Sequence, residues 1–216
     1  MNIRLVIFDL DGTLMNAYPA VRRSVNHVMK YFGHPPVSHA VIKRTVGWGD
    51  RHLLQSFIGD QDLDAALAVY RRHHAAALRK DTELLPGALK ILRYLRSRGV
   101  RIAVASNRPT RFSLIAIRHL KIRKFLDRVL CADKVKRPKP APDILREILK
   151  RSSLRPGQAL YVGDMQIDIN TGRSARVKTV AVATGSNTKS ELRALKPYAV
   201  VDHVYAVKKI LARLDP

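Results

Sequence analysis

The chain alternates between short, continuously apolar runs and longer segments in which apolar residues recur at helical spacing. The first run, residues 5–8, is apolar at every position and stops at a turn, as expected for a strand buried on both faces. Further strands are predicted at 101–105, 128–131, 159–162 and 179–183, with 199–201 as a candidate sixth, and helices over 86–98, 110–120, 143–150 and 165–175. Strands that alternate with helices predict an α/β fold built on a doubly wound parallel sheet.

Residues 16–80 interrupt this alternation. Apolar positions at helical spacing predict four helices there, over 17–32, 38–46, 50–57 and 62–79, and no strand. A helical block of this size between the first and second strands is typical of a small separate domain. We therefore expect a core made of residues 1–15 and 81–216 and an inserted α-helical domain made of residues 16–80.

Polar side chains gather directly after the predicted strands. Asp9 and Asp11 follow the first strand, and Asp164 and Asp168 begin the helix after the fourth. In a parallel sheet the carboxyl ends of the strands share one edge, where ligands bind. Taken separately, the first pair also suits an Asx turn and the second pair suits helix capping. Crowded carboxylates need a cation and their oxygens suit Mg²⁺, so we expect these four acids to be metal ligands.

The segment at residues 9–14, DLDGTL, resembles the first motif of the haloacid dehalogenase-like phosphohydrolases. The resemblance implies that Asp9 is the nucleophile that becomes an aspartyl-phosphate and that Asp11 is the general acid and base. The dehalogenases themselves lack this second acid, which favours phosphate esters as substrates. A carboxylate nucleophile divides one difficult displacement into two steps, and a second carboxyl moves the proton. Gly12 leaves room for close approach of a ligand, so we count it as phosphate-binding.

Other segments resemble the remaining motifs of that family, in the same order along the chain. Ser106 and Asn107 match the motif in which a hydroxyl and a backbone N–H hold the phosphoryl oxygens. Lys139, in the sequence KPAP, matches the lysine that neutralises the phosphate and steadies the nucleophile. The later acidic pair, already assigned to the metal, matches the fourth motif. The catalytic residues implied are Asp9, Asp11 and Lys139, and the phosphate-binding residues are Gly12, Ser106, Asn107 and Lys139.

The helical block occupies the position of the family's type 1 cap domain, and residues 46–49 and 86–99 resemble the phosphoglycolate phosphatase-like branch. The resemblance implies a Mg²⁺-dependent phosphomonoester phosphatase for a small metabolite, with phosphoglycolate the leading candidate. Trp48, Arg22 and Arg51 are candidates for contacting the leaving group, although a lone Trp also suits a packing anchor and helix arginines are mostly solvated. The two histidines at 73–74 match no metal-ligand set, and we expect them on the surface.

Composition adds one anomaly, an excess of positive charge. The 216 residues include 40 Lys and Arg against 17 Asp and Glu, a formal net charge of +23. Such a charge attracts anions and favours nonspecific contact with nucleic acid, but it is spread along the chain, as in a compositional bias. The alternatives to a metabolite phosphatase are a nucleotide or polynucleotide-end phosphatase, a phosphomutase, and a nucleic-acid-binding protein on the same scaffold.

The remaining features concern location. No apolar run approaches the roughly 20 residues of a membrane span, and the N-terminus does not resemble a signal peptide. The single cysteine, Cys131, has apolar neighbours, so we expect a buried and inert thiol in a reducing compartment. These features predict a cytoplasmic enzyme with no membrane contact, and they leave its oligomeric state open.

Overall fold

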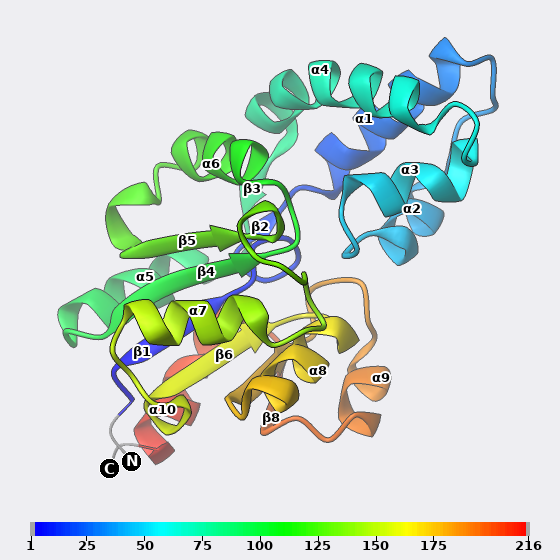
Figure 1. Ribbon diagram of the computed structural model, residues 1–216. Helices are drawn as coiled ribbons and strands as arrows, with labels where there is room; N and C mark the ends of the chain where they lie inside the picture. The colour runs from blue at the N-terminus through cyan, green and yellow to red at the C-terminus, as the bar shows by residue number, and fades with distance from the viewer. Residues whose placement is uncertain (1–2, 215–216) are drawn as a thin grey trace.

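The computed structural model describes residues 3–214 and is organised around one six-stranded sheet (Figure 1). In spatial order the strands are β5 (Arg128–Cys131), β4 (Arg101–Ser106), β1 (Leu5–Phe8), β6 (Ala159–Gly163), β7 (Lys178–Val182) and β8 (Ala199–Val201). Every neighbouring pair is parallel. The chain starts in the middle of the sheet and builds outward on both sides of β1, which confirms the predicted doubly wound parallel sheet.

Helices cover both faces of this sheet. They are α5 (Ala88–Ser97), α6 (Thr110–His119), α7 (Asp143–Arg151), α8 (Gln166–Ala175), α9 (Lys189–Ala194) and α10 (Val207–Leu214). Leu5 and Ile7 pack in one apolar cluster with α7 and α8, whereas Val6 and Phe8 pack in another with α5, α6 and α10. Successive side chains of a strand point to opposite faces, and both faces of β1 are covered, so every position of this strand is apolar.

A helical insert, defined here as residues 18–81, stands beyond the carboxyl ends of the strands (Figure 1). Its helices are α1 (Tyr18–Tyr31), α2 (His39–Thr45), α3 (Asp50–Ile58) and α4 (Leu63–Asp81), close to the four that the sequence predicts. Val25, Ile42, Leu54 and Leu67 belong to an apolar cluster of the insert's own. The C-terminal part of α4 also reaches the core, where Leu78 joins the cluster that lies under α6.

A two-stranded antiparallel ribbon connects the insert to the core. Its strands are β2 (Met15–Asn16) and β3 (Glu83–Leu84), and Met15 pairs with Leu84. The backbone N–H of Leu85 also donates to the carbonyl of Leu14 at 3.0 Å. The sequence did not predict this ribbon, because two residues are too few to show the alternation of a strand.

Other differences from the predicted elements are small. Helices α9 and α10 were not predicted, and short 3₁₀ turns lie at Arg123–Phe125, Ala132–Lys134, Pro156–Gln158 and Val204–Ala206. Cys131 is buried at the end of β5, as expected, and burial raises the pKa of its thiol. Within residues 3–214, no helix has the length and apolar character needed to cross a bilayer.

Candidate active site

Three buried carboxylates meet at the carboxyl edge of the sheet. Asp9 follows β1, Asp164 follows β6, and Asp168 lies in the first turn of α8. Each offers an oxygen within 4.8 Å of the others, and all three side chains are buried. The backbone N–H of Asp9 donates to the carbonyl of Val162 at 2.8 Å, which fixes the loop after β1 against β6. The sheet therefore brings together acids that lie about 150 residues apart in sequence.

Lys139 lies between two of these acids. Its Nζ donates to Asp9 Oδ1 at 2.8 Å, to Asp168 Oδ1 at 2.7 Å and to the Tyr161 hydroxyl at 3.2 Å. Burial alone would lower the pKa of this lysine, but the charges of Asp168 and Asp9 outweigh it and hold the pKa well above 10.5. Burial raises the pKa of Asp9 to about 7 against the opposing effect of the lysine. Lys139 thus remains a cation that orients the expected nucleophile.

Asp164 has no such partner. Thr13 Oγ1 donates to its Oδ1 at 2.9 Å and the Ser186 N–H donates to its Oδ2 at 3.3 Å, but no Lys or Arg within residues 3–214 forms an ion pair with it. Burial raises the pKa of this carboxyl well above its usual value. One ammonium group therefore faces three buried carboxylates. An all-oxygen set with excess negative charge fits a hard divalent cation such as Mg²⁺.

Two glycines make room for this carboxylate. A Cβ at Gly12 would lie 2.4 Å from Asp164 Oδ2, and a Cβ at Gly185 would lie 1.6 Å from the same atom. Gly12 also has a φ of +78°, a conformation that favours glycine. The backbone of two loops therefore packs directly on Asp164 and fixes where its oxygens can lie.

The residues after β4 connect the site to its surroundings. The Asn107 side chain donates to the carbonyl oxygens of Lys139 and Gly47, both at 3.0 Å, and accepts from the Lys139 N–H at 2.9 Å. Its amide is thus used within the protein and holds the lysine loop against the insert. Ser106 Oγ accepts from the Arg108 N–H at 3.2 Å and lines the adjoining cavity.

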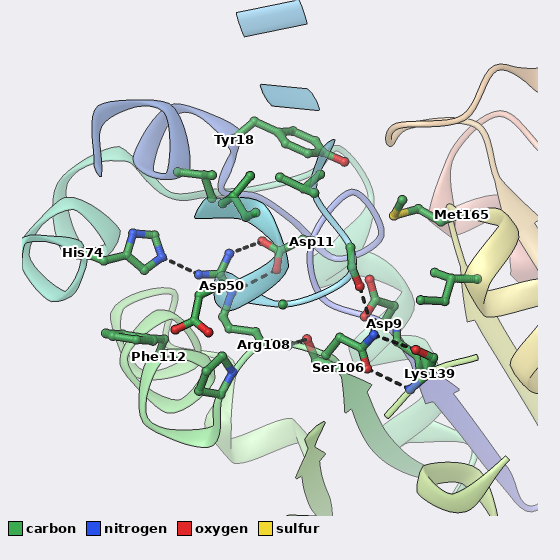
Figure 2. A pocket seen from close by; sticks show the side chains of 18 of the residues that line it. Asp9, Asp11, Tyr18, Asp50, His74, Ser106, Arg108, Phe112, Lys139 and Met165 are labelled. Atoms are coloured by element: carbon green, nitrogen blue, oxygen red, sulfur yellow. Dashed lines mark hydrogen bonds and ion pairs between the residues drawn. The ribbon is translucent and has the colours of Figure 1, made fainter. Parts of the chain in front are cut away.

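A cavity, partly open to solvent, lies between this edge and the insert (Figure 2). The core contributes its charged and polar wall, and the insert contributes a mostly apolar wall opposite. The core side includes Asp9, Asp11, Ser106, Arg108 and Lys139, and the insert side includes Tyr18, Val21, Leu53, Tyr70 and His74.

Asp11 lies apart from the three-carboxylate cluster and is paired with Arg108. Arg108 Nε donates to Asp11 Oδ2 at 3.0 Å and Nη2 donates to Oδ1 at 2.8 Å (Figure 2). A third nitrogen, Nη1, donates to His74 Nε2 at 2.6 Å. The sequence analysis missed Arg108, although its position directly after Ser106 and Asn107 places it at the same strand end.

Comparison with known proteins identifies the family. The family model for haloacid dehalogenase-like hydrolases matches residues 6–182, which include the acid cluster and Lys139. The chain belongs to this family. A phosphoglycolate phosphatase from Pseudomonas putida is 32% identical over 94% of this chain and 78% of the relative, and phosphoglycolate phosphatase 1 from Pseudomonas aeruginosa is 30% identical over 93% and 77%. A crystal structure of a predicted phosphoglycolate phosphatase from Haemophilus somnus is 26% identical, with a TM-score of 0.89 over 97% of this chain and 98% of that one.

His74 of this hydrolase corrects the expectation that both histidines at 73–74 are on the surface. Its side chain is 1% exposed, and its Nδ1 lies 2.9 Å from Ser24 Oγ. Burial and the charge of Arg108 lower the pKa of this imidazole well below 6.5. Because Nε2 accepts from Arg108, the proton of the neutral ring is on Nδ1 and is donated to Ser24.

The three insert residues proposed for the leaving group lie outside the cavity of the hydrolase. Trp48 is 50% exposed with its ring 5.9 Å from that of His52, while its neighbours Gly47 and Gly49 do line the cavity. The Arg51 side chain is 61% exposed and forms an ion pair with Asp64 at 2.7 Å. Arg22 is exposed on the outer side of α1. The sequence located the right turn of the insert, but not the side chains that face the acids.

Proposed function

We propose that this chain is a Mg²⁺-dependent phosphomonoester phosphatase that acts through an aspartyl-phosphate on a small phosphorylated metabolite, with phosphoglycolate as the first candidate. Its enzyme class is phosphoric monoester hydrolase. The observation that carries the proposal is the position of Asp9, held by Lys139 at the head of a cavity and next to a carboxylate without a cation partner. The names of the relatives support phosphoglycolate.

The chemistry follows from the position of each side chain. Lys139 binds Asp9 Oδ1, and the described residues form no hydrogen bond to Oδ2, so this oxygen is available to attack phosphorus in line with the ester bond. The ester P–O bond breaks, and Asp11, with one oxygen released from Arg108 and protonated, gives this proton to the leaving oxygen. Asp11 then takes a proton from the water that attacks the aspartyl-phosphate, which releases phosphate and restores Asp9.

The phosphoryl group would be held by both the core residues and the ion. We assign it to Ser106 Oγ and the backbone of Asn107 and Gly12, with the positive charge of the Lys139 ammonium close by to offset the phosphate charge. Mg²⁺ bound by Asp9, Asp164 and Asp168 would offset the charge on the transferring group. The sequence also predicts Asp11 as a metal ligand. In this proposal Asp11 is the proton donor and acceptor instead.

The insert, for which the sequence predicts residues 16–80, would act as a cap domain. Its apolar side chains face the acids across the cavity, and such a wall excludes water from the reacting groups. A cavity walled by the core on one side and the insert on the other fits a small ester better than the end of a polynucleotide, so we treat the basic surface as a source of nonspecific contact with nucleic acid. We place the enzyme in the cytoplasm.

The test is phosphate release, with and without Mg²⁺, across phosphoglycolate, sugar phosphates, nucleotides and 5′- or 3′-phosphorylated oligonucleotides. We expect Mg²⁺-dependent release that is fastest with a small ester, and one phosphate per alcohol formed, which excludes a mutase. Asp9→Asn should abolish it, while Asp143→Asn, at a partly buried acid that lies outside the cavity and is paired with Arg137, should not. Full activity in Asp9→Asn would refute the mechanism, and a preference for oligonucleotides would give the basic surface a role in recognition.

A further inference from the structure

Arg108 is a partly buried cation whose N–H donors are only partly used. Its side chain is 10% exposed and lines the cavity between α4 and the strand edge (Figure 2). A guanidinium carries five N–H donors. Two of them bind Asp11 and one binds His74, so one N–H on Nη1 and one on Nη2 have no acceptor within residues 3–214. Because Arg108 lines the cavity, these two N–H groups are available to a ligand that supplies acceptors.

Lys139 and Asp50, which also line the cavity, are already paired within the protein. All three donors of the Lys139 ammonium are used, by Asp9, Asp168 and Tyr161. Asp50 is paired with Arg71 at 2.8 Å. Among the cations that line the cavity, Arg108 is therefore the one with donors left for a ligand.

The surroundings of Arg108 hold it in place without adding charge. The neutral His74 ring accepts from Nη1, and Ser24 fixes that ring from the other side at 2.9 Å. The Tyr70 ring stacks on His74 with centroids 4.6 Å apart, and the Phe112 ring lies edge-on at 5.2 Å. The guanidinium is thus oriented by the insert and the core together, in an environment where a hydrogen-bonded ion pair is strong.

We propose that Arg108 is a specificity-determining residue that binds a carboxylate on the leaving group, and that the substrates are phosphate esters of small 2-hydroxy acids. This inference rests on the proposed phosphatase function. The Asp11 carboxylate, which would protonate the leaving oxygen, lies 2.8 Å from Arg108. The ester oxygen and the free donors must therefore be neighbours in the bound complex. In an ester of a 2-hydroxy acid the carboxylate is attached to the carbon that carries the ester oxygen, which meets this requirement.

The space beside Arg108 favours a carboxylate over a second phosphate, which is bulkier. Arg108 already binds one carboxylate through a two-pronged contact, and the apolar side chains of Val21, Leu53 and Phe112 limit the space beyond it. The planar fork of a guanidinium matches a carboxylate, whereas a lysine offers a point charge. We therefore expect Lys at this position to recover part of the selectivity and Gln to recover none.

The experiment compares two substrates that differ only in the carboxylate. Phosphoglycolate and ethyl phosphate have the same phosphate and the same ester oxygen, and ethyl phosphate carries a methyl group in place of the carboxylate. Because any effect of Arg108 on Asp11 is common to both, the ratio of their kcat/KM values isolates the carboxylate contact. We expect Arg108→Gln to reduce this ratio about 100-fold, mainly through the KM for phosphoglycolate. Arg108→Lys should reduce it less.

Arg111→Gln is the matched control, because it removes the same charge three residues away from an exposed side chain outside the cavity. It should leave the ratio unchanged. An unchanged ratio in Arg108→Gln, with both esters still hydrolysed, would overturn this inference and leave the proposed function standing.

Calorimetric binding of the two esters to the wild type and to the Arg108 variants gives the same comparison without turnover. If the wild type hydrolyses neither ester, the proposed function fails. A binding preference for phosphoglycolate that Arg108→Gln removes would then still support the carboxylate contact, and equal binding of both esters would refute it.

Discussion

Replacing Gly185 by alanine tests whether the position of Asp164 controls the site. The added Cβ would lie 1.6 Å from Asp164 Oδ2 and 2.2 Å from its Cγ, whereas real Cβ atoms essentially never approach within 3.0 Å of another heavy atom. The methyl group or the carboxylate must therefore move by at least about 1.4 Å. Any such movement disturbs the hydrogen bonds from Thr13 and Ser186 that hold this carboxylate.

Two effects of different size should follow. Insertion of a methyl group into a closely packed site costs about 1–3 kcal/mol of unfolding free energy. A displacement of about 1 Å in a catalytic constellation can cost roughly 100-fold in rate. We expect Gly185→Ala to remain folded, to lose at least about 100-fold in kcat, and to need a higher Mg²⁺ concentration for half-maximal activity, because Asp164 is a proposed metal ligand.

The assay combines urea unfolding with phosphate release measured as a function of Mg²⁺ concentration. Gly59→Ala is the control, because a Cβ there meets nothing within 4 Å while its φ of +78° strains an alanine. With ψ at −170°, this conformation is essentially restricted to glycine, and the strain costs about 1–3 kcal/mol. The control should therefore lose similar stability but keep its kcat. If Gly185→Ala turns over like the wild type with the same Mg²⁺ dependence, the assignment of Asp164 as a metal ligand is wrong.

Three further predictions concern charge. Lys139→Met leaves the buried Asp9 and Asp168 without their shared cation, so unfolding in metal-free urea should show a loss of about 3–5 kcal/mol; stability equal to the wild type would mean that these acids carry no charge when folded. Removal of Mg²⁺ by a chelator should lower the Tm of the wild type, because Mg²⁺ at 100 times its Kd stabilises the folded protein by about 2.7 kcal/mol. The Tm of Asp164→Asn should not change, and equal shifts in the two proteins would exclude this carboxylate as a ligand. His74 faces Arg108, His73 and Tyr70, and its folded pKa lies below the unfolded value of 6.5. The stability it contributes is therefore complete above pH 6.5 and is lost as the pH falls, by up to about 1.4 kcal/mol per pH unit; His74→Gln should remove this dependence, and a pH-independent difference between the two proteins would refute it.

The sheet and most of the acid site could be predicted because both depend on a local pattern. A strand buried on both faces must be apolar throughout, and in a parallel sheet the residues after such strands share one edge, which brings Asp9 and Asp164 together. The C-terminal helix α10 was missed although its signal is present, since Val207, Ile210, Leu211 and Leu214 follow helical spacing.

The side chains of the insert that line the cavity could not be predicted in the same way. His74 is polar, and the period of α4 cannot show that this face of the helix meets a buried arginine instead of water. Trp48 and Arg51 were chosen by residue type, but the orientation of a turn and of a helix decides which side chains face the cavity. That orientation depends on packing between the insert and the core, and residue type carries no information about it.

The ribbon of β2 and β3 makes the helical insert exchangeable. The chain leaves the core and returns to it through neighbouring strands, since Met15 pairs with Leu84. The core therefore needs only that the two ends of the inserted segment lie side by side. Closing a loop that is twice as long costs only about 0.6 kcal/mol more, and the sheet contributes its acids whatever segment is attached. A different closed segment could be grafted onto the same two strands and bring new side chains to the cavity. The residues that recognise the substrate could then change while the acids proposed to cleave the ester stay where they are.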